Sequence, residues 1–401
     1  MWGGYNHNTM KNNQKGFTNV SLIIVVVALV AIGGYFVLSK KSIIPSETQQ
    51  TQTPNDVQEG DKIDTPPITT TSLDKITTPD KILKVAIGLI SKQFSPDFYP
   101  KVSADGSKIV FWKRGEGKPE EKGLWVINVD GTEMKQLIKD DLIGTGDSFE
   151  WSPITDTHYN DRYVFYIAQK EIPTQTKFSS TTHVLKVVNQ DGNYSKELTP
   201  NSERVAFPRW ISINEIAYID KNDDNKLKIV DINGKKVIRS SDEMALVYGE
   251  YRDKSLSHGV IKSITFNGVV KQLIPDNDNG VFPVLSPDKK KVVYTSFWSG
   301  PQKIMVMNID GSNKIQVASG SFPSWSFDSS RIAYYITEED GYNVTASDIY
   351  VVNADGSGNK KVETGIEKGP ALNPRWFPDG KHIVLDYSDK GVGTIEIVPV
   401  E

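Results

Sequence analysis

The 401-residue chain contains no cysteine. This absence excludes disulfide bonds, a thiolate nucleophile, and zinc or iron–sulfur sites built on cysteine. The five histidines include no pair with the spacing of metal ligands and no His-Glu-x-x-His motif. The chain also lacks a Gly-x-Ser-x-Gly nucleophile elbow, a Walker loop and a dinucleotide-binding fingerprint. We therefore expect no catalytic residue, no cofactor and no enzymatic activity.

Basic residues are not in excess beyond the N-terminus. Residues 1–41 hold four lysines and no acid, so the remainder carries 42 basic and 50 acidic residues, a net charge of −8. A net-negative domain repels phosphate backbones unless a basic patch dominates locally, and the sequence shows no such patch. Nucleic acid is therefore not expected as a partner.

Long apolar runs are rare, and the one present extends from Val20 to Leu38 with 19 uncharged residues. A helix of this length spans the ~30 Å hydrocarbon core of a bilayer at ~1.5 Å per residue. The run is longer than that of a cleaved signal peptide, and Lys40-Lys41 follows it. We predict an uncleaved single-pass signal anchor over 20–38, after a short arm at 1–19. A short arm before a large domain favours an extracytoplasmic C-terminal domain, in the periplasm or on the cell surface.

Residues 39–80 are rich in Thr, Pro, Gln and Ser and poor in large apolar residues. Such a composition cannot bury enough surface to offset the entropy lost on ordering, so we predict a flexible linker. The stretch Lys15–Ser21 resembles the start of type IV prepilins, in which a glutamate stands where this chain has Ser21. A pilin-like surface protein with a folded head is kept as an alternative on this resemblance.

One pattern recurs from about residue 98 to the end of the chain. A short aromatic and proline-containing segment is followed by a β-branched run, a second such run and an Asp-Gly or Asn-Gly turn. The six clear copies begin at Phe98, Phe149, Phe207, Phe282, Phe322 and Asn373. Each copy has the length and turns of a four-stranded antiparallel meander, which cannot bury both faces alone. A radial arrangement, in which each sheet covers the next, satisfies all copies.

The expected fold is therefore all-β, a β-propeller of four-stranded blades over residues 81–401. Residues 241–281 lack the Pro-x-Trp signature but hold three strand-like runs. We interpret them as a degenerate blade, which gives seven blades; six blades with a long insertion is the alternative. The last copy lacks an outer strand, and we predict that a segment within Lys81–Ile90 supplies it and closes the ring.

The motif Phe-Pro-x-Trp-Ser, followed by a β run and by Ile349–Gly356 (Ile-Tyr-Val-Val-Asn-Ala-Asp-Gly), resembles the TolB-like (WD40-like, PD40) β-propeller repeat. The resemblance covers roughly residues 95–401. It implies a bacterial cell-envelope role in contact with other proteins. The chain differs from TolB in having an anchor and a linker and in lacking a recognisable N-terminal TolB domain, so membership of the same assembly does not follow.

Tryptophans and aspartates each recur at one position of the repeat, and both sets are candidates for a binding surface. The tryptophans at one repeat position are Trp151, Trp210, Trp325 and Trp376. We interpret them as packing residues between blades, because the same position accepts Val102 and Leu285. The aspartates of the tight turns are Asp105, Asp288, Asp328 and Asp379. We interpret them as turn residues that accept hydrogen bonds from nearby amides.

Two acidic loops have the alternating oxygen ligands of calcium sites. The residues concerned are Asp220, Asn222 and Asp224 in one loop and Asp276 and Asp278 in the other. Neither loop has the glycine and glutamate of an EF-hand at the required positions. We favour solvated hairpin loops and expect no metal.

These observations favour a membrane-anchored binding or scaffold module of the cell envelope with a protein or peptide partner. The alternative of a different class is a carbohydrate-active enzyme with carboxylates in the propeller funnel. Two carboxylates about 5–9.5 Å apart in a deep pocket would favour that alternative.

Overall fold

A computed structural model gives the structure of the protein. The residues that it describes are 84–89, 98–115, 118–139, 148–153, 162–172, 180–251, 259–297, 301–339, 344–366, 369–389 and 392–400. The predicted arm, transmembrane helix and linker lie outside these residues. Within them, helix is limited to the short 3₁₀ turn η2 (Pro119–Glu121), and none is long and apolar enough to cross a bilayer.

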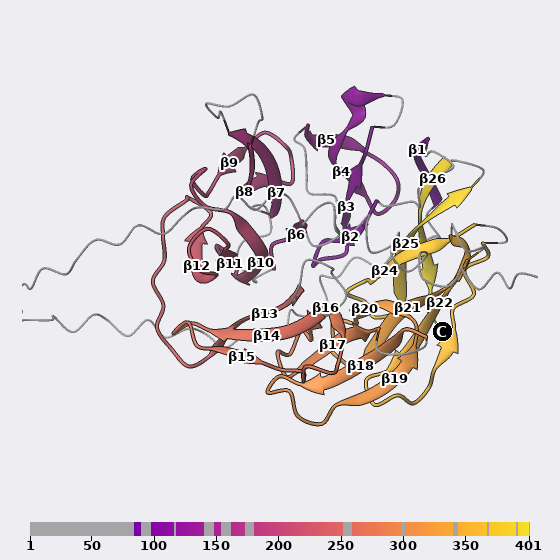
Figure 1. The fold of residues 1–401 in the computed structure, drawn as a ribbon. Helices are drawn as coiled ribbons and strands as arrows, with labels where there is room; N and C mark the ends of the chain where they lie inside the picture. The colour runs from indigo at the N-terminus through magenta and orange to yellow at the C-terminus, as the bar shows by residue number, and fades with distance from the viewer. Residues whose placement is uncertain are drawn as a thin grey trace, which may run out of the picture.

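The strands form seven antiparallel sheets arranged around a central axis (Figure 1). Blade 1 contains β2 (Lys101–Val102), β3 (Lys108–Lys113), β4 (Gly123–Asn128) and β5 (Lys135–Ile138). Blade 2 contains β6 (Phe149–Trp151), β7 (Tyr163–Ile172), β8 (Ser180–Asn189) and β9 (Ser195–Glu197). Blade 3 contains β10 (Val205–Ser212), β11 (Glu215–Asp220) and β12 (Lys226–Asp231). Blades 4 and 5 contain β13 (Met244–Tyr251), β14 (Gly259–Thr265) and β15 (Val270–Gln272); and β16 (Gly280–Leu285), β17 (Lys291–Ser296), β18 (Lys303–Asn308) and β19 (Ile315–Ser319). Blades 6 and 7 contain β20 (Ser321–Trp325), β21 (Arg331–Glu339), β22 (Val344–Asn353) and β23 (Lys360–Lys361); and β24 (Ala371–Trp376), β25 (His382–Asp389), β26 (Val392–Pro399) and β1 (Lys84–Leu89).

The ring closes through pairing of the two ends of the described chain. Strand β1 pairs antiparallel with β26, in a register that joins Lys84 to Glu396 and Leu89 to Val392. This strand supplies the outer edge that the last repeat lacks, as the sequence predicts. The buried Asp386 of β25 adds a second link between blades 7 and 1, because its Oδ2 accepts the backbone N–H of Phe98 at 2.7 Å.

The prediction of seven blades is confirmed, and the alternative of six is wrong, because residues 244–272 form a sheet of their own. The prediction that every blade has four strands is wrong for blades 3 and 4, which have three each within the described structure. In blade 3 the fourth position is reduced to one bridge between Val230 and Lys236. In blade 4, residues 237–243, which link this bridge to β13, form no strand.

The core lies between neighbouring blades, and the repeated tryptophans contribute to it as expected. Trp151, Trp325 and Trp376 are buried. Three indole N–H groups donate to a backbone carbonyl in the inner strand of the preceding blade: Trp151 to Lys101 at 3.0 Å, Trp210 to Glu150 at 3.1 Å and Trp325 to Val284 at 3.0 Å. Each of these three tryptophans therefore joins two blades by packing and by one hydrogen bond, whereas the indole N–H of Trp376 is buried without a hydrogen-bond partner among the described residues.

The repeated aspartates close the turns between the first two strands of their blades, which confirms the interpretation as turn residues. Asp328 Oδ1 accepts the Ser326 hydroxyl at 2.6 Å and the Ser330 amide at 3.0 Å. The same contacts recur around Asp105 and Asp288. Hydrogen bonds of this kind preorganise a turn and leave the carboxylate occupied.

Candidate functional site

Five of the six inner strands carry, in the strand or directly before it, a strained residue that the sequence pattern does not predict; β6 is the exception. The strained residue stands directly before a proline and has a positive φ, which costs energy in a residue other than glycine. The residues and φ values are Tyr99 at 49°, Phe207 at 52°, Phe282 at 52°, Phe322 at 51° and Asn373 at 51°. In four of these strands the pairing register shifts at the same place, so each strand carries a β-bulge there. The repeated residue-Pro pair was the sequence signal for it.

The bulges bring aromatic rings together on the inner strands. Phe282 stacks on Phe322 with ring centroids 4.5 Å apart, and Phe322 stacks on Tyr335 at 5.4 Å. On blades 3 and 4, Phe207 stacks on Tyr248 at 5.3 Å. The rings of Phe207, Phe282 and Phe322 are half-buried. The inner part of the propeller therefore presents flat apolar faces that suit contact with a partner.

Among the described residues, blade 4 differs from the other blades in having no inner strand. In complete blades, the residue after the third strand donates its backbone N–H to the carbonyl of the residue before the second strand. Ile309 donates to the Lys290 carbonyl in blade 5, and Ala354 donates to the Ser330 carbonyl in blade 6. The matching bond in blade 4 runs from Phe266 N–H to the Glu243 carbonyl, directly before β13. Strand β13 therefore corresponds to the second strand of a blade, and it is also the strand of its sheet nearest the axis (Figure 1).

The inner edge of β13 carries backbone groups without a ladder partner. Leu273 N–H donates to the Ile261 carbonyl at 2.8 Å, so Ile261 faces β15. Its register partner in β13 is Gly249, which therefore directs its N–H and C=O away from β14. The same alternation applies to Val247 and Tyr251. Within the described structure, no backbone–backbone hydrogen bond uses these three residues on that side. We call them the open inner edge.

The surroundings of the open inner edge are aromatic and charged. Gly249 lies against blade 5, because a Cβ placed on it would lie 3.1 Å from Pro283 Cδ. On the other face, Glu250 forms ion pairs with Lys221 and with Lys262, the latter at 2.8 Å. Burial opposes ionisation of Glu250, but the two lysines outweigh it and hold the pKa of Glu250 below its ordinary value. Burial and Glu250 raise the pKa of Tyr248 to about 12, so this phenol stays protonated.

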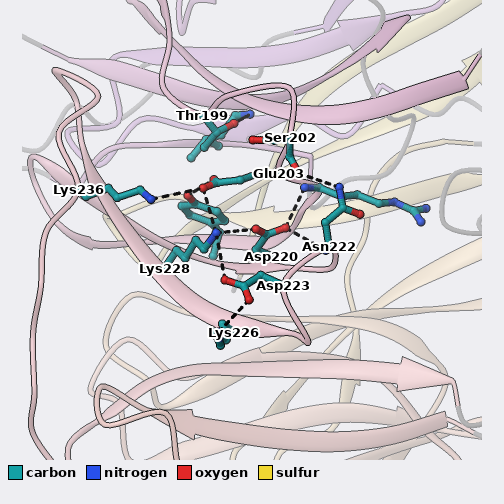
Figure 2. A network of polar contacts seen from close by, with 12 residues as sticks. Thr199, Ser202, Glu203, Asp220, Asn222, Asp223, Lys226, Lys228 and Lys236 are labelled. Carbon is teal, nitrogen blue, oxygen red and sulfur yellow. Dashed lines mark hydrogen bonds and ion pairs between the residues drawn. The ribbon is translucent and has the colours of Figure 1, made fainter. Parts of the chain in front are cut away.

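A second polar cluster lies on blade 3, where the chain enters from blade 2 (Figure 2). Glu203 and Asp220 are almost fully buried, at 4% and 1% exposure. Lys228 lies between them, with Nζ at 3.0 Å from Glu203 Oε1 and 2.6 Å from Asp220 Oδ2. The Tyr218 hydroxyl donates to Glu203 Oε2 at 2.6 Å. We call Glu203, Asp220, Lys228 and Tyr218 the blade 3 network.

The contacts of this network favour the ionised forms of Asp220 and Lys228 and the neutral form of Tyr218. Burial disfavours the Asp220 carboxylate, but hydrogen bonds from Lys228 and from the Arg204 and Asn222 amides hold the pKa of Asp220 below its ordinary value. Burial also disfavours the Lys228 ammonium, yet its bonds to Asp220 and Glu203 raise the pKa of Lys228. Burial raises the pKa of Tyr218, and Glu203 adds to this effect. A site for proton transfer needs a group that titrates near the working pH, and these shifts lead away from neutrality.

The structure separates the residues of the two acidic loops. Asp220 belongs to the blade 3 network, Asn222 donates its side-chain amide to the Ser202 carbonyl at 3.0 Å, and Asp224 is exposed. Asp276 accepts Gln272 Nε2 at 2.9 Å, and Asp278 pairs with Lys314 at 2.8 Å. Among the described residues, no three His, Cys, Asp or Glu side chains form a group suited to a metal ion.

Comparison with known proteins gives the fold and no closer relationship. No family model and no curated protein matches the chain. Oligogalacturonate lyase from Vibrio parahaemolyticus is 14% identical over 80% of this chain and 97% of its own, with a TM-score of 0.52. An oligogalacturonate lyase in complex with manganese matches over 80% of this chain and 98% of its own, with 14% identity and a TM-score of 0.52.

TolB from Acinetobacter baumannii is 17% identical over 68% of this chain and 67% of its own, with a TM-score of 0.41. Similarity at these levels of identity shows the fold alone, and propellers carry many unrelated functions. The chain is thus an all-β, seven-bladed β-propeller similar in fold to oligogalacturonate lyase, and its function has to be argued from its own residues.

Proposed function

We propose that the chain is a membrane-anchored, extracytoplasmic β-propeller that binds a protein or peptide partner and performs no reaction of its own. The observation that supports binding is the open inner edge of blade 4, flanked by stacked aromatic rings. Unpaired strand edges are sites at which segments of other chains add, and most folded proteins cover them. An edge kept open near the axis of a ring is therefore the best-supported binding surface.

The state of four buried or half-buried acids in blades 3 to 5 supports a binding role over catalysis in that part of the propeller. The carboxylates of Glu203, Asp220, Glu250 and Asp278 each pair with a lysine. The pKa values of Asp220 and Glu250 are lowered, so neither acid is poised to donate a proton near neutral pH. Glycoside hydrolysis needs one carboxyl with a raised pKa beside a second free carboxylate. No observation on these four acids favours that alternative.

Photo-crosslinking tests the position of the partner. Phe207 and Phe327 are both replaced, one at a time, by p-benzoylphenylalanine in the full chain, and intact cells producing each variant are irradiated. We expect a discrete protein or peptide adduct from position 207, because its ring lies beside Tyr248 next to the open inner edge. Phe327 is the matched control, being 42% exposed in a turn of blade 6. Equal adducts from both positions, or none from position 207, would contradict the proposal.

The absence of cysteine allows a direct test of topology. Ile238 is 95% exposed on the propeller, so an Ile238→Cys variant presents one accessible thiol. We expect a membrane-impermeant maleimide to label it in cells whose outer layers admit the reagent, whereas Asn12→Cys in the N-terminal arm stays unlabelled until the membrane is dissolved. The opposite pattern would place the propeller in the cytoplasm. Labelling of both sites in the absence of detergent would exclude anchoring by 20–38.

A further inference from the structure

We infer that the partner binds as the missing inner strand of blade 4, by antiparallel strand addition to β13, and that it is an extended segment with an aromatic residue or asparagine followed by Pro-x and a large apolar residue. This inference rests on the proposed function and specifies its chemistry. It follows from the geometry of the open inner edge, from the strands on either side and from the chain's own inner strands.

The open inner edge has the geometry that other blades use for an inner strand. In blade 6, Ser321 and Ser324 of β20 lie opposite Tyr335 and Ala333 of β21. In blade 5, Val281 and Val284 of β16 lie opposite Thr295 and Val293 of β17. Tyr248-Gly249 in β13 corresponds to Tyr294-Thr295 in β17, so Gly249 and Val247 stand where the pairing residues stand in the complete blades. An added strand would find amides and carbonyls already directed toward it.

The position of the missing inner strand lies between residues of blade 3 and residues of blade 5. Strand β10 of blade 3 and strand β16 of blade 5 both contact β13. Phe207 of β10 is stacked on Tyr248, and Pro283 of β16 lies against Gly249. An inserted segment would therefore contact an aromatic face on one side and a proline-containing bulge on the other. Both contacts are apolar, which favours an occupant with large apolar side chains.

Blade 5 carries no indole that would need the missing strand as an acceptor. Trp151, Trp210 and Trp325 each donate an indole N–H to the inner strand of the preceding blade. At the matching position, blade 5 has Leu285, which needs no acceptor. An indole here would have no inner-strand carbonyl to bind in the free protein, and a buried unpaired donor costs about 1–3 kcal/mol. Leucine removes this cost and still offers an apolar surface to an added strand.

The chain's own inner strands indicate which segment fits. Five of the six, all except β6 of blade 2, share an aromatic residue or asparagine, a proline, a variable residue and a large apolar residue: Tyr99–Val102, Phe207–Trp210, Phe282–Leu285, Phe322–Trp325 and Asn373–Trp376. The bulge at the residue before proline recurs with them. Because the open inner edge has the geometry of β17 and β21, the same short pattern is the expected recognition element of the partner.

A peptide of residues 319–328 (Ser-Gly-Ser-Phe-Pro-Ser-Trp-Ser-Phe-Asp) serves as the probe. Ser326 N–H donates to the Arg331 carbonyl, so by alternation the Ser324 amide faces β21 and the Trp325 amide does not. We expect fluorescence anisotropy to give a Kd on the order of 10–100 µM with the full chain in detergent. N-methylation at Ser324 should weaken binding at least ~10-fold, and N-methylation at Trp325 less than ~3-fold. Equal effects of the two methylations would overturn the inference.

Two proline variants test the receiving edge. Val247→Pro removes an amide at the open inner edge. Val270→Pro removes an amide at the outer edge of the same sheet, because Lys271, opposite Ser263, directs its backbone groups toward β14 and the neighbouring Val270 directs its own away from it. Neither change breaks the β13–β14 ladder, because proline is tolerated where an N–H faces away from the sheet. We expect loss of peptide binding only in Val247→Pro, with thermal unfolding reported for both. Slowed hydrogen exchange of the Val247, Gly249 and Tyr251 amides on adding the peptide gives a readout without substitution.

Hydrogen exchange and crosslinking distinguish other occupants of the open inner edge from a failure of the proposed function. Amides of the open inner edge that are protected in the full chain but not in fragment 81–401, which retains every described strand, would assign the edge to the chain's own linker and overturn the inference. Protection that rises with protein concentration would assign it to a second copy, with the same consequence. A crosslink at position 207 that survives Val247→Pro would leave the binding function standing and refute strand addition.

Discussion

Removing residues 1–90 is expected to lower the free energy of unfolding of the propeller by about 4–6 kcal/mol relative to the fragment that begins at residue 81. The deletion takes away β1 and with it the five register pairs between β1 and β26. Each lost backbone hydrogen bond contributes about 1 kcal/mol, and loss of Val85 uncovers apolar surface at the blade 7–blade 1 core. Urea unfolding followed by tryptophan fluorescence measures the difference.

The same deletion has a matched rescue. A synthetic peptide of residues 81–92 added to fragment 91–401 should recover part of the lost stability in a concentration-dependent manner, because it can pair with β26. Without it, the exposed edge of β26 is expected to promote self-association at high protein concentration. Fragments 81–401 and 91–401 of equal stability would show that ring closure does not depend on β1.

Replacing Lys228 by methionine is expected to destabilise the protein by about 3–5 kcal/mol at neutral pH. The ammonium bridges two carboxylates that are 5% and 2% exposed as side chains. Its removal takes the lysine partner from Asp220 and leaves Glu203 with the exposed Lys236, 3.9 Å away. Lys226→Met is the matched control: its side chain is 65% exposed and pairs with Asp223 at 2.8 Å, so we expect a loss below ~1 kcal/mol. Restoring neutrality with Glu203→Gln and Asp220→Asn in the Lys228→Met background should recover most of the loss.

The contribution of Asp220 to the stability of the natural protein and its contribution in Lys228→Met should change with pH in opposite directions. In the natural protein the pKa of Asp220 is lower folded than unfolded, so its contribution is complete above about pH 4 and is lost as the pH falls further. In Lys228→Met, the ammonium no longer offsets burial, and burial raises the pKa of Asp220. The deficit of that variant should therefore shrink as the pH falls toward 4. A deficit independent of pH would mean that Lys228 acts through packing alone.

The strained inner strands and the open inner edge belong to one structural scheme. A residue with positive φ before proline is costly, and in two of the five cases a side chain of the preceding blade accepts its amide. Asp386 does so for Tyr99 at 3.1 Å and Thr295 for Phe322 at 3.3 Å. In blade 4 the matching residue is Gly249, which offers no side-chain acceptor and instead admits Pro283. Blade 4 thus departs from the repeat both in its missing strand and in this contact.

The sequence indicated where the candidate site lies, but it did not predict the geometry of that site. The missing Pro-x-Trp signature in residues 241–281 indicated a degenerate blade. It did not show which strand was absent, because one lost signature is compatible with a shortened outer strand as well as with a missing inner one. The repeated residue-Pro pairs likewise marked the bulges without showing their positive φ. The partners of Asp220 and Asp278 were also hidden, because Lys228 and Lys314 reach them only across folded strands.

The sequence by itself determined the all-β class, six clear repeats, the packing role of the tryptophans and the supply of the last outer strand by residues 81–90. These features follow from turn chemistry and β periodicity, which are local properties present in each repeat. The tertiary structure alone decided which edge of blade 4 stays unpaired, which aromatic rings stack beside it and which lysines neutralise the buried acids. These features depend on side chains and strand edges brought together from different blades, and such contacts leave no periodic trace along the chain.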